Sequence, residues 1–209
     1  MRVLLLNGSP HSAGTTYTAL TEVEKTLREA GVETDLVHIG TRPIQGCSAC
    51  HACAGYGKCA FTGDIVNTLI DKMAACDGLV VGTPVYYASP NGALLAVLDR
   101  LFFAADKAIF RGKPAAAVAC ARRAGTVSSL DVIQKYFTIS EMPVVSSQYW
   151  CCAHGNSGAE AQQDGEGMQI LRTLGRNMAW LLRCIEAGKA AGVALPAREP
   201  RISTNFIRK

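Results

Sequence analysis

Short apolar runs alternate with amphipathic stretches along nearly the whole chain. The apolar runs are rich in Val, Leu, Ile and Ala and end at turn residues, which predicts buried β-strands of about five residues. The stretches between them repeat apolar positions every three or four residues, which predicts helices. The predicted strands are 3–6, 33–39, 78–82, 115–120 and 142–147, and the predicted helices are 15–30, 64–75, 91–105, 127–137 and 165–187.

Five buried strands separated by helices predict an α/β fold with helices on both faces of the sheet. Right-handed crossovers restrict this to a doubly wound, five-stranded parallel sheet, for which we expect the strand order 2-1-3-4-5. That order places a ligand at the carboxyl ends of the first and third strands. We expect residues 1–190 to form this single domain, with a cysteine-rich insertion at 46–62. Residues 191–209 are an irregular tail that we interpret as a possible arm toward another subunit.

The composition excludes several classes of protein. Of the 209 residues, 18% are charged and 49% are apolar, which is typical of one compact domain. The net charge of +4 is spread along the chain, which does not favour nucleic-acid binding. No segment resembles a signal peptide or a membrane span. Nine cysteines without a secretion signal favour thiols or cluster ligands in the reducing cytoplasm.

The loop after the first strand, residues 8–16, is rich in hydroxyl and glycine residues and leads directly into a helix. Backbone N–H groups at a helix start bind anions, so this loop predicts a phosphate site. It lacks the Lys of a triphosphate-binding loop and the Gly-x-Gly-x-x-Gly of a dinucleotide loop. It therefore suits one phosphate monoester, such as that of FMN, with an ordinary capped turn as the alternative. The candidate hydroxyls are those of Ser9, Ser12, Thr15 and Thr16.

Two later loops lie at the same predicted sheet edge. The loop after the third strand, residues 83–92, carries Tyr86 and Tyr87, whose aromatic rings would lie against a flat ligand. The loop after the fourth strand carries Arg122 and Arg123, either of which would stabilise negative charge on a reduced ring. The alternative is that both arginines are ordinary surface residues.

Taken in order and spacing, these motifs resemble the NADPH-dependent FMN reductase family of the flavodoxin-like fold. The resemblance covers about residues 1–190 and rests on Gly8-Ser-Pro, Thr15-Thr16, Thr83-Pro-Val-Tyr-Tyr, Asp99-Arg100 and Ala121-Arg-Arg-x-Gly125. It implies bound FMN, with Ser9, Ser12, Thr15 and Thr16 at its phosphate. It further implies that the isoalloxazine is bordered by Pro84, Val85, Tyr86, Tyr87, Ala121, Arg123, Gly125 and Thr126. Members often have Asn where this chain has Thr15.

A run of four cysteines, Cys47, Cys50, Cys53 and Cys59, is the sharpest local pattern. Its first three members have the Cys-x2-Cys-x2-Cys spacing of bacterial ferredoxins, although the fourth follows after five residues instead of three. The run resembles that of the iron–sulfur flavoproteins, a branch of the same family, which implies a 4Fe-4S cluster. Zinc is a weaker alternative, because the ligands of a structural zinc site usually come as two pairs separated by a longer stretch of sequence. Thiols that bind no metal are the third possibility.

The family resemblance implies an NAD(P)H-dependent oxidoreductase that reduces FMN and passes electrons to a small-molecule or protein acceptor, with the cluster as a possible relay. The rival function is an FMN electron carrier that turns over no small substrate. A flavin-free zinc or regulatory module is a third. We expect a homodimer or homotetramer with no nucleic-acid partner and no membrane contact.

Overall fold

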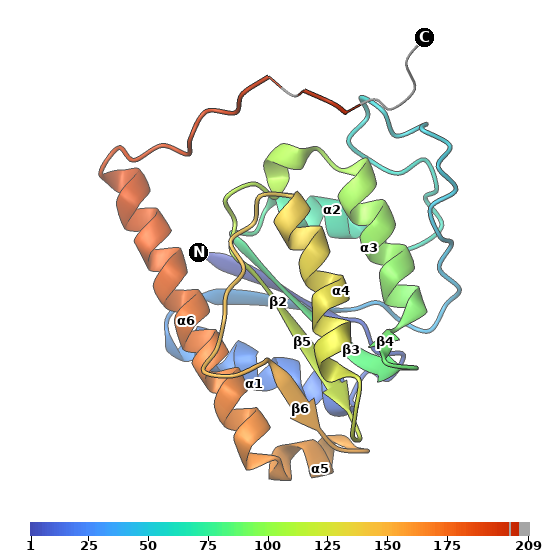
Figure 1. The fold of residues 1–209 in the computed structure, drawn as a ribbon, viewed down its shortest axis with the longest axis vertical. Helices are drawn as coiled ribbons and strands as arrows, with labels where there is room; N and C mark the ends of the chain where they lie inside the picture. The colour runs from blue at the N-terminus through green and yellow to red at the C-terminus, as the bar shows by residue number, and fades with distance from the viewer. Residues whose placement is uncertain (201, 205–209) are drawn as a thin grey trace.

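The computed structural model describes residues 1–200 and 202–204, and in it a parallel sheet lies between two layers of helices (Figure 1). Neighbouring strands run in the order β2-β1-β3-β5-β6. A short strand, β4, pairs antiparallel with the end of β3. The strands are β1 (Arg2–Asn7), β2 (Glu33–His38), β3 (Gly78–Tyr86), β4 (Ser89–Pro90), β5 (Ala115–Ala121) and β6 (Cys152–His154).

The helices divide between the two faces of the sheet, as Figure 1 shows. Successive strand residues point to opposite faces, so Val3 and Leu5 pack in one core while Leu4 and Leu6 pack in the other. The first core lies under α1 (Thr15–Glu29) and α6 (Gly165–Ala190). The second lies under α2 (Val66–Ala74), α3 (Gly92–Ala104) and α4 (Thr126–Ile139). The predicted doubly wound flavodoxin-like architecture is thereby confirmed.

The last strand of the sheet lies later in the chain than the sequence predicts. Within the predicted strand 142–147, only Val144 bridges to β5, and the regular pairing is made by β6. The reason is competition from α6. Asn177 donates a hydrogen bond to the carbonyl oxygen of Ser146 at 2.8 Å, and the Ser147 hydroxyl donates to the carbonyl oxygen of Ile170 at 2.6 Å. These bonds hold the segment to the helix. Residues 149–164, where no strand or helix was predicted, contain both β6 and a short helix, α5 (Gly158–Gln163).

The described part of the tail folds back on its own chain. Arg198 pairs with Glu141 at 2.6 Å, and Glu141 also pairs with Arg111 at 2.6 Å, just after the short helix η1 (Lys107–Ile109). Residues 201 and 205–209 of the predicted arm lie outside the described residues. None of the described helices is long and apolar enough to cross a bilayer.

Candidate functional site

The loop after β1 is held against β3 and α3 by backbone contacts that require glycine. Gly8 donates its N–H to the carbonyl oxygen of Gly82 at 2.8 Å and accepts from the Asn91 side chain at 2.8 Å. A Cβ on Gly8 would lie 2.8 Å from the backbone carbonyl oxygen of Gly82 and 2.5 Å from a methyl carbon of Leu94, which leaves no room for a side chain. The Asn91 side chain also caps α3 by accepting from the Ala93 N–H. The first and second loops are therefore joined through one residue.

The predicted phosphate hydroxyls lie together, but in different environments. The buried Ser9 hydroxyl accepts from the His11 N–H at 3.0 Å, so it shapes the turn. Ser12 is exposed, and the Thr15 hydroxyl donates to the carbonyl oxygen of Gly155 at 3.2 Å. Thr16 is buried beneath the helix start. The N-cap residue Gly14 supplies no side-chain cap, which leaves first-turn N–H groups of α1 available to an anion.

The second loop is a tight hairpin, which the sequence pattern did not predict. Val85 pairs with Pro90 and Tyr86 with Ser89, and the two residues between these pairs have positive φ angles. Tyr87 has φ 52° and Ala88 has φ 56°, the signature of a two-residue hairpin turn that usually takes Asn-Gly. Tyr87 is fully exposed at the tip.

The third and fourth loops close the same edge of the sheet. Gly125 has φ 92°, and a Cβ on it would lie 2.7 Å from the Cα of Ala88, so the third loop touches the tip of the hairpin. In the fourth loop, which follows β6, Gly155 donates its N–H to the carbonyl oxygen of Ala121 at 3.1 Å. Arg122 and Arg123 are exposed at this edge. None of the residues of the fourth loop is among the predicted FMN contacts. The sequence marks this loop by the aromatic residues Tyr149 and Trp150 and by His154, which follow the last predicted strand.

The His154 backbone N–H donates to the Asp164 carboxylate at 2.7 Å, and the same carboxylate caps α6. The nearby thiols are buried. Burial raises the pKa of Cys120 to about 12, against the opposing effect of a hydrogen bond with Thr16. Burial likewise raises the pKa of Cys152. These two thiols therefore stay protonated at neutral pH and serve the core of the sheet.

The cysteine loop forms a second site. Cys47, Cys50, Cys53 and Cys59 line one pocket together with Phe61 and Phe103. The backbone turns sharply within the run, with φ angles of 53° at Ala49 and 57° at His51. The Ala52 N–H and, less strongly, the Ser48 hydroxyl lower the pKa of Cys50. Among the residues that the structure describes, no three His, Cys, Asp or Glu side chains converge on a single ion.

Arg100 is the residue of this second site that the sequence analysis did not assign. Its side chain is 1% exposed and donates from Nε to the Cys59 sulfur at 3.2 Å. It also donates to the carbonyl oxygens of Gln45 at 3.1 Å and Phe61 at 2.9 Å, and it pairs with Asp64. Burial alone would lower the pKa of Arg100, but the hydrogen bonds to Asp64 and Cys59 outweigh it and raise the pKa. The sequence signal was an arginine on the otherwise apolar face of α3.

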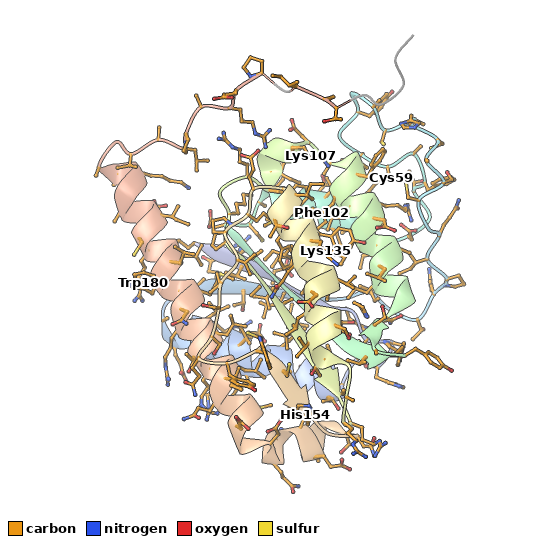
Figure 2. The ribbon with its side chains drawn as sticks, in the orientation of Figure 1. Cys59, Phe102, Lys107, Lys135, His154 and Trp180 are labelled. Atoms are coloured by element: carbon orange, nitrogen blue, oxygen red, sulfur yellow. The ribbon has the colours of Figure 1, made fainter. Side chains whose placement is uncertain are left out.

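The two sites lie toward opposite ends of α3. Asn91, which contacts the first loop, precedes Arg100 by nine residues, or roughly 14 Å along a helix axis. Figure 2 shows Cys59 and His154 far apart in the view, with His154 at the carboxyl edge of the sheet. The cysteine pocket is thus a separate feature from the four loops.

Comparison with known proteins identifies the family. The family model described as NADPH-dependent FMN reductase matches residues 1–157. The chain belongs to this family. An iron-sulfur flavoprotein from Methanocaldococcus jannaschii is 28% identical over 89% of this chain and 100% of its own length. The family resemblance inferred from the sequence is confirmed, and this relative carries the name of the branch that the cysteine run indicated.

Solved structures show the same fold. RosB, crystallised with an 8-demethyl-8-formylriboflavin-5'-phosphate intermediate, aligns with a TM-score of 0.69 at 17% identity, covering 100% of this chain and 94% of RosB. A WrbA-like flavodoxin from Agrobacterium tumefaciens aligns with a TM-score of 0.62 at 14% identity, covering 88% of this chain and 98% of that protein. Both likenesses establish the flavodoxin-like fold of this member of the family.

Proposed function

We propose that the chain is an FMN-dependent oxidoreductase that takes its electrons from NAD(P)H. The observation that carries the proposal is the meeting of four loops around the uncapped start of α1, at the switch point of a doubly wound sheet. First-turn N–H groups with the Ser12 and Thr15 hydroxyls would bind the phosphate. The buried hydroxyls of Ser9 and Thr16 would hold the loop in shape beneath it.

The hairpin and the third loop would hold the ring. Tyr86 and Tyr87 are exposed apolar surface beside Gly125, and Arg123 supplies positive charge at the same edge. A fixed positive charge there would stabilise negative charge on the ligand. When bound, FMN would accept hydride from NAD(P)H and deliver electrons to an acceptor. The protein would position FMN and NAD(P)H relative to each other and exclude other orientations of the two molecules.

We also propose that Cys47, Cys50, Cys53 and Cys59 hold a 4Fe-4S cluster. The pocket fits such a group, because all four cysteines line it and a buried cation, Arg100, donates to the sulfur of Cys59. In a cluster of this type each thiolate binds its own iron, so the ligands surround a body wider than one ion. Four cysteines around one pocket supply the four thiolate ligands that such a cluster takes.

Anaerobic kinetics test the oxidoreductase. Purified protein should show an oxidised flavin spectrum that NADH or NADPH bleaches, and it should then turn over with a quinone or an azo dye as acceptor. The two nucleotides compared side by side would identify the donor. A flavin that dithionite reduces but neither nucleotide reduces would instead establish an electron carrier, and a colourless protein containing zinc would refute both.

A single cysteine substitution tests the ligand set. Cys59→Ser should lose iron and sulfide yet keep one FMN per chain, because the cysteine pocket and the four loops lie toward opposite ends of α3. Cys184→Ser is the matched control, since Cys184 is an exposed thiol of α6 outside the pocket. Iron and sulfide assays beside the flavin absorbance give the answer. Iron content equal to that of the unsubstituted protein would refute the assignment of Cys59.

The remaining proposals concern assembly and compartment. All nine cysteines are free in the structure, which supports the proposal of a reducing, cytoplasmic compartment.

The exposed aromatic residues Trp150 and Trp180 support the proposal of a homodimer or homotetramer. A native mass of twice or four times the 22.2 kDa chain mass would be expected.

A further inference from the structure

Arg100 connects parts of the cysteine loop that are separated in sequence. Its guanidinium donates to the carbonyl oxygen of Gln45, which precedes the first cysteine of the run, and to that of Phe61, which follows the last. One side chain therefore fixes both flanks of a loop of about fifteen residues to α3. Closing a flexible loop of this length costs conformational entropy that grows with its length. The planar guanidinium group of arginine carries a fork of five N–H donors, so it can donate to several acceptors at once.

Cys59 is fixed at its backbone as well as at its sulfur. Asn67 accepts from the Cys59 N–H at 2.8 Å and donates to the Cys59 carbonyl oxygen at 2.9 Å. Arg100 donates to the sulfur at 3.2 Å. Cys47 and Cys50, by contrast, are exposed. The fourth cysteine of the run is therefore the one whose main chain and sulfur are both held by side chains of neighbouring helices.

The charge of Arg100 matters because the side chain is 1% exposed. A buried cation is costly unless anions compensate it. The structure supplies the Asp64 carboxylate, and thiolate ligands of a cluster would add further negative charge. Hydrogen bonds to cluster sulfurs are among the features that set a cluster's reduction potential.

We propose that Arg100 is a positioning residue for the cysteine pocket, closing the loop and holding the Cys59 sulfur in place to receive a cluster. The inference rests on the proposed cluster and adds to it the residue that prepares the site. Arg100 gives the pocket its shape in the metal-free protein and a charged hydrogen-bond donor in the loaded protein.

The test compares variants that separate the Cys59 contact from the ion pair. Asp64→Asn removes the carboxylate charge and keeps the contacts of Arg100 with Cys59, Gln45 and Phe61. Asn keeps a side-chain oxygen at this position, so the Val66 N–H, which donates to Asp64 at 3.2 Å, keeps an acceptor. The double variant Arg100→Met with Asp64→Asn removes the contacts without leaving a buried unpaired charge. Arg100→Lys keeps the charge but not the fork, and Arg176→Met, on the exposed side of α6, is the charge-matched control.

Three measurements give the outcome, with FMN content and circular dichroism as checks of folding. In metal-free protein, the Cys59 amide should exchange hydrogen faster in the double variant. In anaerobically reconstituted protein, iron release to a chelator should be about tenfold faster in the double variant, a typical effect of losing an outer-sphere partner. The midpoint potential should become more negative. Arg176→Met should behave like the unsubstituted protein. Asp64→Asn leaves the buried Arg100 cation without its carboxylate, and Arg100→Lys loses the fork, so both should fall between the unsubstituted protein and the double variant.

The outcomes separate this inference from the proposed function. Unsubstituted protein that takes up no iron and sulfide would overturn the cluster and, with it, the role of Arg100 toward the cluster. A second outcome would overturn the inference about Arg100 alone. In that outcome the unsubstituted protein loads iron and sulfide normally, and the double variant has the same Cys59 amide exchange, iron release and midpoint potential. A double variant that folds and keeps FMN but behaves no differently from Asp64→Asn would have the same consequence.

Discussion

Gly125 shows how a single residue determines whether two loops can meet. It has φ 92°, a region that favours glycine, and it lies against the backbone of Ala88 at the tip of the hairpin. Any side chain at this position would meet main-chain atoms, which cannot move away as a flexible side chain can. The contact therefore fixes the spacing between the second and third loops, the two segments assigned to the isoalloxazine.

Gly125→Ala should consequently destabilise the protein and weaken FMN binding. The strained backbone and the clash together should cost about 1–3 kcal/mol of unfolding free energy. Thermal unfolding and fluorescence titration with FMN measure the two effects. Gly92→Ala is the matched control, because nothing lies within 4 Å of a Cβ at Gly92, in the first turn of α3. Equal FMN affinity in the two variants would show that the second and third loops do not jointly border the ring.

At the level of elements, the sequence predicted the strands and helices well where hydrophobic periodicity was long and unbroken. The strands β1, β2, β3 and β5 and the long α6 lie close to their predicted ranges. The sequence did not reveal the β3–β4 hairpin, because Tyr87 and Ala88 occupy positive-φ positions where Asn-Gly would be expected. It also misplaced the last strand, because the hydrogen bonds that hold Ser146 and Ser147 to α6 are tertiary contacts.

The residues of the candidate site also fall into two groups, those that the sequence predicts and those that only the structure places at the site. The first three loops and the cysteine run could be found from sequence because motif spacing marks them. The contribution of Gly155 from the fourth loop, and that of Arg100 from α3, depend on hydrogen bonds between residues far apart in the chain. Such bonds do not follow from local spacing. The sequence marks Arg100 only as an arginine among apolar residues, and the fourth loop only by Tyr149, Trp150 and His154.

The unusual turn between β3 and β4 leads to a prediction about stability and FMN affinity. Replacing Tyr87 and Ala88 by Asn and Gly should raise stability by up to about 1–2 kcal/mol, because these residues adopt positive φ with less strain. If Tyr87 borders the flavin, FMN affinity should fall at the same time. Thermal unfolding without FMN and a titration with FMN measure the two effects, and Ala88→Gly alone separates turn strain from loss of the ring. Unchanged affinity in the double variant would remove Tyr87 from the site.

At the scale of the whole molecule, buried thiols link stability to alkaline pH. Burial raises the pKa values of Cys120 and Cys151 to about 12, while an unfolded chain would ionise both near their ordinary value of 9.0. Between these values the unfolded state loses protons that the folded state keeps. Folding stability should therefore be fully present below pH 9 and decline as the pH rises toward 12, by about 1 kcal/mol per thiol at pH 10.

Denaturant unfolding at pH 8 and pH 10 tests this, with Cys120→Ala as the comparison. The variant should be less stable than the unsubstituted protein at pH 8, because it loses packing in the core formed by α1, α6 and the sheet. Its stability should also fall less between the two pH values, since one ionising thiol has been removed. Equal losses in both proteins would mean that Cys120 does not resist ionisation. The carboxyl edge of the sheet would then be more accessible to solvent beneath Thr16 than the packing of the fold implies.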